Sequence, residues 1–445
     1  MPSIRSIVVA ALVCMAVFPS AARAQSSNDL ANVLLTFFSP ENPVVLAPNP
    51  NPALSHAAHF VSQEQAQVVL RQVNAGIAAQ ISTFPIGASS AGFTYTFDEN
   101  LGVYNRTTQS FGPIFTERPL TAGRNKFTFG VNYQHATWDS LEGKDLRDGS
   151  MTFYLTHQDV NHDGTNLAPW FEGDIIRANL HTELESKTTV VYANYGITER
   201  FDVSLAVPFV DVSLQASIDT TIERLSTGAD PFVVHRFDDG RSTHTYLAGG
   251  SANGVGDLLL RGKYNFLRKP GGSMAALLDV RLPTGNENDL LGSGATQVKL
   301  ALLGAGSPGR FTPRVGAGYT FSSGGSTYTG DLPNEVYCTA GFDAVPHKRV
   351  TLTADFIGRT LLDAERIVDV EQTFHYDLRL DPTVRSATRT ELGTTTGNVS
   401  LLLGSAGLKI NPVGNLLLVG NVLFKIGNHG LQDKVTPVFG LDYTF

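Results

Sequence analysis

The sequence predicts an all-β membrane protein, a transmembrane antiparallel β-barrel of about 12 strands with an N-terminal plug or extension. The last residues, from Val435 to Phe445, carry an apolar side chain at every odd position and end on phenylalanine. This period of two is typical of the strand that closes an outer-membrane barrel, and we assign Gly440, Tyr443 and Phe445 to that closing signal. A sheet can span lipid only when it closes on itself, because every backbone polar group needs a partner there. The predicted location is therefore the outer membrane of a Gram-negative-type bacterium.

Residues 1–24 have the pattern of a secretory signal peptide. Arg5 precedes an apolar run from Ile7 to Phe18, and Ala22 and Ala24 form the small-residue cleavage pattern. No later segment approaches about 18 consecutive apolar residues, which argues against a helical membrane protein. The formal net charge of −8 gives no support for nucleic-acid binding.

Twelve segments after residue 125 alternate between an apolar, charge-free face and a polar face. In the clearest one, Leu258, Leu260 and Tyr264 share one face, and Arg261 and Lys263 share the other. A soluble β-sandwich also alternates, but the charge-free faces and the export signal favour a barrel. The predicted strands cover residues 127–133, 174–195, 201–209, 257–266, 273–283, 298–302, 311–321, 336–342, 350–356, 399–410, 416–424 and 435–445.

The connections between these segments alternate in length. Short turns on the periplasmic side and long loops outside are typical of outer-membrane barrels. The short connections are residues 198–200, 267–272, 307–310, 346–348 and 411–415. The long ones are residues 139–173, 212–256, 284–295, 322–334 and 360–398.

Residues 25–120 differ from the barrel that we predict over residues 121–445. A proline- and asparagine-rich stretch is followed by a helix predicted over residues 62–81, with Ala66, Val73 and Ile77 near one face. Phe93, Tyr95 and Phe97 fit one short strand. Three interpretations remain open for this region: a plug in the barrel, a periplasmic extension, or a thirteenth and a fourteenth wall strand.

Several charged side chains share the polar face of the predicted strands. Their cations could form a basic strip that attracts anions or polar substituents in the lumen. The hairpin register, however, sets Arg261 opposite Asp279 and brings Glu335 near Arg359, and such pairs would brace the wall without a ligand. The candidate lumen-lining residues are Asp257, Arg261, Lys263, Asp279, Arg281, Lys299 and Arg314.

One loop suggests a metal, and no motif suggests catalysis. Asp159, Asn161 and Asp163, followed by Gly164, match the first half of a calcium loop, in which alternate oxygens surround Ca²⁺. The twelfth position is Trp170 where a glutamate is expected, so a solvated turn is the alternative. The His-x-Ser-Asn-Gly run of a twelve-stranded outer-membrane phospholipase and any G-x-S-x-G motif are absent. We therefore predict that the chain is not an enzyme.

Three stretches resemble a known family. They are YGITERFD at 195–202, GVGDLLLRGKY at 254–264, and LPTG at 282–285 with LGSG at 291–294. They are similar to outer-membrane barrels assigned to the meta-pathway of phenol degradation, and the similarity covers residues 192–321. The resemblance implies a channel or transporter that takes up small hydrophobic or aromatic compounds. The expected partners are outer-membrane lipid, the barrel-assembly machinery and that solute. A non-transporting structural or surface-exposed barrel is the alternative.

Overall fold

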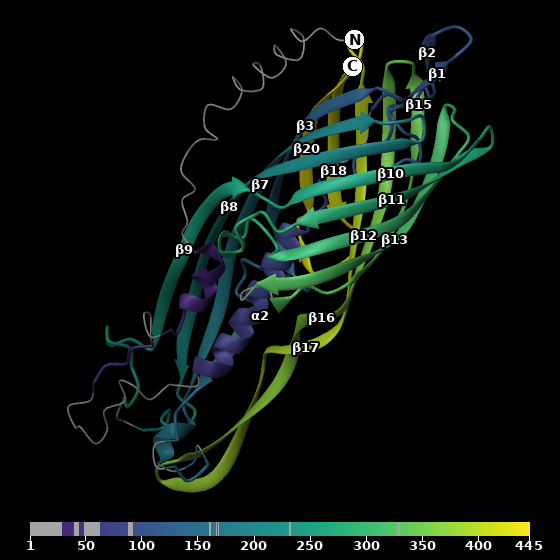
Figure 1. Cartoon of the computed structure of the whole chain (residues 1–445). Helices are drawn as coiled ribbons and strands as arrows, with labels where there is room; N and C mark the ends of the chain where they lie inside the picture. The colour runs from purple at the N-terminus through teal and green to yellow at the C-terminus, as the bar shows by residue number, and fades with distance from the viewer. Residues whose placement is uncertain are drawn as a thin grey trace.

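The computed structural model describes residues 29–39, 44–48, 63–87, 92–159, 162–165, 167, 169–230, 233–326 and 330–445. The predicted signal peptide lies outside these ranges. Within them, twelve antiparallel strands close into a barrel, as predicted (Figure 1). They are β3 (Phe127–Trp138), β7 (Ile175–Gly196), β8 (Phe201–Glu223), β10 (Leu258–Lys269), β11 (Gly272–Leu282), β12 (Ala295–Gly306), β13 (Phe311–Ser326), β15 (Glu335–His347), β16 (Val350–Leu378), β17 (Asp381–Ile410), β18 (Leu416–Lys425) and β20 (Val435–Thr444).

The ring closes between the first and last wall strands, β3 and β20. Tyr443 lies opposite Phe129 and Gly440 opposite Asn132 in the register of this pair. The Phe445 N–H donates to the Phe127 carbonyl at 2.8 Å, which extends the pairing to the chain end. Since β3 pairs directly with β20 and β7, no position remains for a thirteenth or fourteenth wall strand among the described residues. That alternative is wrong.

The outer face of the barrel carries an apolar belt of the height of a membrane. On β8 the outward side chains are apolar from Phe201 to Phe209 and turn polar at Asp211. Lys187 on β7 pairs with Asp211, so the belt ends at the same level on both strands. A transmembrane strand needs about 9–11 residues, which fits this span. Aromatic side chains mark both edges of the belt: Phe127, Tyr195, Tyr264, Phe311, Phe342 and Tyr443 at the end with the short turns, and Tyr133, Phe209, Phe321, Phe424 and Phe439 at the other.

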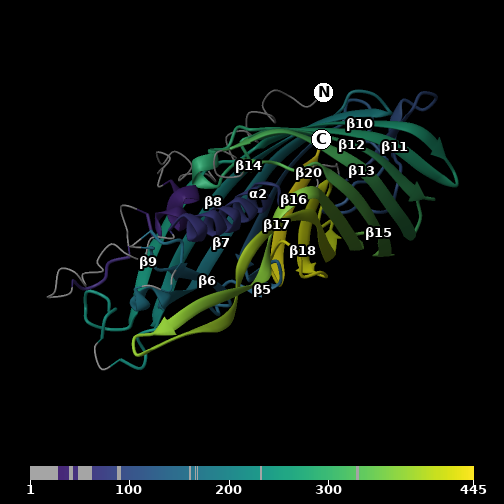
Figure 2. The same ribbon diagram turned by 90° about the horizontal axis from the view of Figure 1, so that it is seen from below.

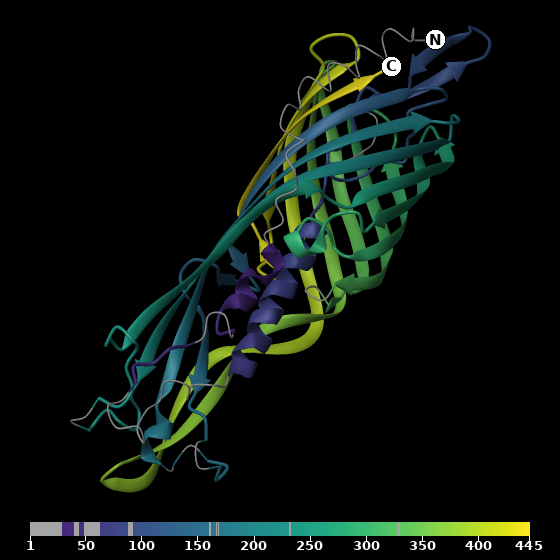
Figure 3. The ribbon, with the colours of Figure 1, turned by 60° about the vertical axis from the view of Figure 1, so that its left-hand side comes forward.

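We call the barrel end with the short turns the turn end, and the opposite end the outer end. Four wall strands, β7, β8, β16 and β17, continue well beyond the belt at the outer end (Figure 3). The predicted loops 212–256 and 360–398 are therefore largely strand, and this prediction was wrong. Outside the lipid the outward side chains are polar, so the sequence lacks the charge-free face that identified the membrane-spanning parts.

Shorter elements complete the outer end and form, with the extended strands, a region that we call the cap. β6 pairs with β7, and β9 pairs with β8 beyond the belt. The Gly256 N–H bonds the Pro208 carbonyl where β9 gives way to β10, so both follow β8. The elements are β4 (Ser140–Leu141), β5 (Lys144–Asp145), β6 (Met151–Thr156), β9 (Thr243–Val255), β14 (Gly330–Asp331), β19 (Leu431–Gln432), η3 (Trp170–Gly173) and η4 (Glu287–Asp289).

The N-terminal part forms η1 (Leu30–Thr36), α2 (Gln63–Ser82), β1 (Tyr95–Asp98) and β2 (Val103–Arg106). The predicted helix is thus confirmed. Leu70, Val73 and Ile77 on α2 are fully buried in an apolar core that also contains Phe38 and Trp138. This core joins η1, α2 and the cap strands, beside which α2 lies in Figure 2. None of the described helices is long and apolar enough to cross a membrane.

The N-terminal chain passes from the outer end to the turn end before the barrel begins. Leu46 forms a bridge with Phe237 in the cap. The β1–β2 hairpin lies at the turn end, where the Tyr95 hydroxyl donates to the Asn415 side chain at 3.1 Å. Residues 107–122, which we call the lumen loop, then lead back inside the barrel before β3 starts.

A charge placed on the lipid face should cost much more than the same charge in the cap. Leu278 on β11 is 43% exposed on the belt, whereas Leu247 on β9 is 74% exposed beyond it. Leu278→Arg should lower the free energy of unfolding in lipid vesicles by about 2–4 kcal/mol. Leu247→Arg is the matched control and should leave it nearly unchanged. Equal losses in the two variants would contradict the placement of the belt.

Candidate functional site

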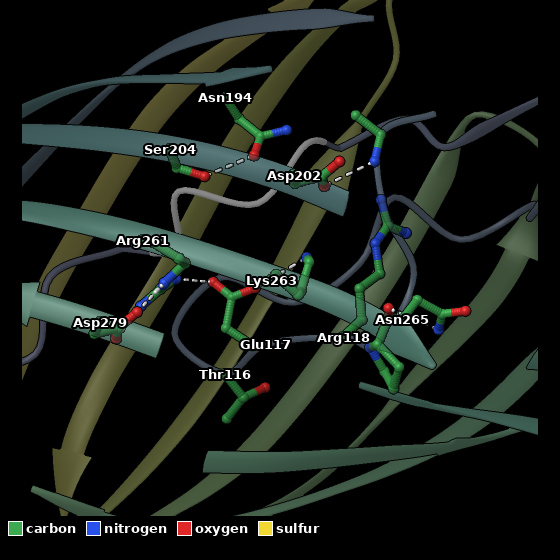
Figure 4. Close-up of polar contacts among 12 residues, drawn as sticks. Thr116, Glu117, Arg118, Asn194, Asp202, Ser204, Arg261, Lys263, Asn265 and Asp279 are labelled. Atoms are coloured by element: carbon green, nitrogen blue, oxygen red, sulfur yellow. Dashed lines mark hydrogen bonds and ion pairs between the residues drawn. The ribbon is translucent and has the colours of Figure 1, made fainter. Parts of the chain in front are cut away.

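The lumen contains an ion-pair network around Glu117 of the lumen loop (Figure 4). Arg261 on β10 lies opposite Asp279 on β11 and binds its carboxylate through two contacts, Nε to Oδ1 at 2.6 Å and Nη2 to Oδ2 at 2.7 Å. The remaining amino group of Arg261 donates to Glu117. Lys263, two residues along the same strand face, places Nζ 3.5 Å from Oε2 of Glu117. One loop carboxylate therefore joins two wall cations.

A second cluster surrounds Arg314 on β13. Its guanidinium lies 2.8 Å from Asp343 on β15 and 3.0 Å from Asp355 on β16. The lumen loop joins this cluster as well, because the Ser110 hydroxyl donates to Asp343 at 2.7 Å and the Thr116 hydroxyl to Asp355 at 2.9 Å. Both carboxylates and the arginine are almost fully buried. The loop is thus attached at two separate places on the wall, at β10 and at β15 with β16.

A third set of contacts attaches the C-terminal end of α2. Arg359 on β16 pairs with Glu335 on β15 at 2.6 Å and donates to the Thr83 carbonyl at 3.0 Å. Arg281 on β11 donates to the Ser82 carbonyl. Carbonyl groups at a helix C-terminus carry partial negative charge, so cations there are favourable.

The remainder of the lumen loop is attached near the turn end by backbone groups. The Pro119 carbonyl accepts from Asn265 at 3.0 Å, and the Ala122 N–H donates to Asp202 at 2.9 Å. The Thr121 hydroxyl donates to the Glu199 carbonyl at 2.8 Å. The loop therefore makes polar contacts with the wall from the turn end to the middle of the barrel.

A small cavity with both polar and apolar lining remains between the lumen loop and the wall. Its volume is about 90 Å³, and charged groups such as Glu117, Arg281 and Arg359 line it. Lys299 also lines the cavity, with Nζ 4.3 Å from the centre of the Tyr337 ring. The space is large enough for water molecules, and its polar groups could bind them. The lumen loop and its wall partners thus fill much of this section of the lumen.

Six of the seven candidate lumen-lining residues face the interior: Arg261, Lys263, Asp279, Arg281, Lys299 and Arg314. Asp257 lies next to them and lines a neighbouring interior cavity with Arg281 and Ser82. Its carboxylate accepts hydrogen bonds from the Gly285 N–H at 3.1 Å and the Ser293 N–H at 2.9 Å, and so fastens the connection between β11 and β12. The predicted wall pairs, Arg261 with Asp279 and Arg359 with Glu335, are both present.

Sequence reasoning missed the lumen-loop residues Thr116, Glu117 and Arg118. Glu117 and Arg118 are the only charged residues between positions 107 and 122. Arg118 is buried and donates to the Gly92 carbonyl at 3.0 Å. An adjacent acidic and basic residue in an otherwise uncharged stretch could have marked this position. It would not have shown which wall residues they bind.

The predicted calcium loop has no assembled metal site among the described residues. Asp159 accepts the Gly164 N–H at 2.7 Å, and Asp163 accepts the Thr165 N–H at 2.8 Å. Asn161 lies outside the described residues. No group of three or more metal-binding side chains is found in the described part. Calcium binding at Asp159 and Asp163 therefore stays a prediction.

Comparison with known proteins gives one sequence match. The family model described as "Putative MetA-pathway of phenol degradation" matches residues 176–332. The resemblance predicted from the sequence is confirmed over this stretch. With its closed sheet and apolar belt, the protein is an outer-membrane β-barrel. No curated protein matches the chain significantly.

Solved structures with similar folds are outer-membrane proteins. The COG4313 outer membrane channel from Pseudomonas putida F1 has 13% identity and a TM-score of 0.45, and the match covers 74% of this chain and 99% of that one. The translocator domain of the autotransporter NalP from Neisseria meningitidis has 11% identity and a TM-score of 0.35, covering 73% and 89%. A Pseudomonas aeruginosa FadL homologue has 10% identity and a TM-score of 0.31, covering 74% and 92%. At these values the fold assignment rests on the strand pairing of this chain.

Removing the charge of Glu117 should loosen the lumen loop. Glu117→Gln leaves Arg261 bound to Asp279 but weakens the link to the loop, and we expect a loss of about 1–3 kcal/mol in the free energy of unfolding. Ion conductance in planar bilayers should rise. Asp442→Asn is the control, since Asp442 pairs with Lys409 of the wall at 3.6 Å. A conductance gain of the same size in the control would show that the loop contact is not what closes the lumen.

The calcium prediction is tested by limited proteolysis. If the loop binds Ca²⁺, the parent protein should resist cleavage there better with calcium than with chelator, because the ion joins separate ligands. Asp159→Ala with Asp163→Ala should abolish this difference. Equal cleavage of the parent protein in both conditions would remove the metal site from further consideration.

Proposed function

We propose that this protein is an outer-membrane channel for small hydrophobic or aromatic compounds. The observation that carries the proposal is the family match over residues 176–332, whose family description concerns phenol degradation. The matched stretch spans consecutive wall strands from β7 to β13 together with the connections between them. Phenol and its relatives are small aromatic molecules, so the chemistry of the proposed solute follows from that description.

The contents of the lumen support a selective channel over an open diffusion pore. The small cavity in the lumen is lined by charged groups that bind one another. A barrel of twelve strands is wider than the eight-stranded size that side chains fill, and narrower than the sixteen-stranded size that leaves a channel. The lumen loop occupies the space that the inward side chains of twelve strands leave empty. Passage of a solute would then require the loop contacts of Glu117, Ser110 and Thr116 to rearrange.

The filled lumen also favours one alternative function, a structural barrel that transports nothing. A buried ion pair and two buried hydrogen bonds attach the lumen loop to separate strands of the wall, which would suit a permanently closed interior. Three further points are predictions. They are that the inward-facing residues take part in solute passage, that the barrel-assembly machinery inserts the protein, and that the protein is not an enzyme.

Uptake separates the two functions. Cells that lack other channels for aromatic compounds should accumulate labelled phenol or toluene faster when they produce this protein, whereas a labelled sugar should enter no faster. The Leu247→Arg variant, changed only in the cap, serves as the matched control and should behave as the parent. Equal acceleration of the sugar would indicate an open pore. No acceleration of either solute, with the protein correctly inserted, would favour the structural barrel.

A further inference from the structure

The short turns at the turn end of the barrel carry an excess of cations, although the whole chain has a net charge of −8. We define the rim as residues 123–126, before β3, together with the turn regions 197–200, 267–271, 307–310 and 346–349. Its charged residues are eight cations and one carboxylate, Glu199. The remaining short turn, residues 411–415, has no charge. The cations are Arg124, Lys126, Arg200, Arg268, Lys269, Arg310, Lys348 and Arg349.

None of these eight cations forms an ion pair within the described part of the chain. They contrast with cations of the cap, where Lys144 lies 2.6 Å from Asp369 and Arg366 lies 2.9 Å from Glu142. Carboxylates of the same chain therefore pair with many cations of the cap but with none of the eight cations of the rim among the described residues. An excess of unpaired cations at one end of a protein creates a positive potential that attracts negatively charged groups of other molecules.

Part of the rim forms a groove. Residues 106–109, which follow the β1–β2 hairpin, lie beside the turn regions 307–310 and 345–348 around an open space of about 680 Å³. Arg106, Arg310, His347 and Lys348 line it, and no carboxylate does. Arg310 and Lys348 are exposed, whereas the Arg106 guanidinium stacks 4.6 Å from the centre of the Phe111 ring. The stacking holds one cation in place while the other two remain available.

The groove lies at the level of lipid head groups. Phe311 and Phe342, on the two strands beneath it, face outward with exposures of 59% and 38%, and their ring centres are 5.1 Å apart. Aromatic side chains of membrane barrels lie at the interface between the hydrocarbon and the head groups. Phe311 directly follows Arg310, so the backbone of Arg310 lies at the edge of the apolar belt, at the height of the lipid head groups.

We propose that the rim binds the phosphate head groups of anionic phospholipids in the periplasmic leaflet, with the groove at Arg310 and Lys348 as its principal seat. Cations are distributed over four of the five short turns, and this arrangement matches a ring of lipids around the barrel better than one protein partner. Arginine and lysine are the side chains that bind phosphate through charge-assisted hydrogen bonds. Lipid bound there would fix the depth of the turn end in the membrane.

Lipid retention tests the proposal. The full chain is reconstituted in nanodiscs with equal amounts of phosphatidylglycerol and phosphatidylcholine, extracted with mild detergent, and analysed for retained lipid by mass spectrometry. The parent should retain an excess of phosphatidylglycerol that falls at high salt, because salt screens exposed charges. Arg310→Gln with Lys348→Gln should reduce the excess by roughly fivefold or more. Arg241→Gln with Arg385→Gln removes two cations from the cap and should leave it unchanged.

Other outcomes would overturn the proposal. Equal retention of the two lipids by the parent would do so, as would an unchanged excess in the folded rim variant or an equal loss in the cap variant. Poly-glutamate provides a second probe, added to the parent in discs of phosphatidylcholine alone. Binding of this peptide to the rim without any lipid preference would assign the rim to an acidic protein partner. Heat-dependent gel migration shows that each variant has folded.

Discussion

Every other feature of this protein depends on the backbone pairing that joins β3 to β20. Without it the sheet would have two open edges in the hydrocarbon, and each unpaired N–H or carbonyl group there would cost several kcal/mol. Closure of the sheet determines which side chains face the lipid and which face the lumen. It also sets the diameter, and a ring of twelve strands leaves more space than its inward side chains fill. The N-terminal chain supplies the missing material.

The enclosed space explains why charged residues are abundant inside a membrane protein. A buried charge is costly unless it is paired and hydrogen-bonded. Here Arg261 and Arg314 each meet a carboxylate of a neighbouring strand, and the lumen loop adds Glu117 to the first and two hydroxyl groups to the second cluster. The wall pairs are therefore nearly complete in themselves. The loop adds contacts that a modest rearrangement could exchange for water.

The sequence revealed the membrane-spanning strands because lipid imposes a simple rule on them. On β10 the outward side chains from Leu258 to Phe266 are all uncharged, and this alone identifies the strand and its facing. The rule fails where lipid ends, so the outer half of β8 and the whole of β9 were taken for loop. Asp257 keeps the alternation of β10 yet lies before the strand and binds Ser293. Glu117 could not be found, because its partner Arg261 is 144 positions away and no local pattern connects them.

The route of the N-terminal chain limits how the interior can open. Leu46 is bound in the cap, the Tyr95 hydroxyl is bound at the turn end, and α2 lies between them with its apolar face in the cap core. The segment is thus threaded through the barrel and held at both mouths. The segment cannot move out toward the periplasm as one unit, because α2 would have to pass through the whole lumen. If the interior opens with these contacts intact, the lumen loop must move locally between its two attached ends. A chain threaded in this way also has to enter the barrel before β3 meets β20.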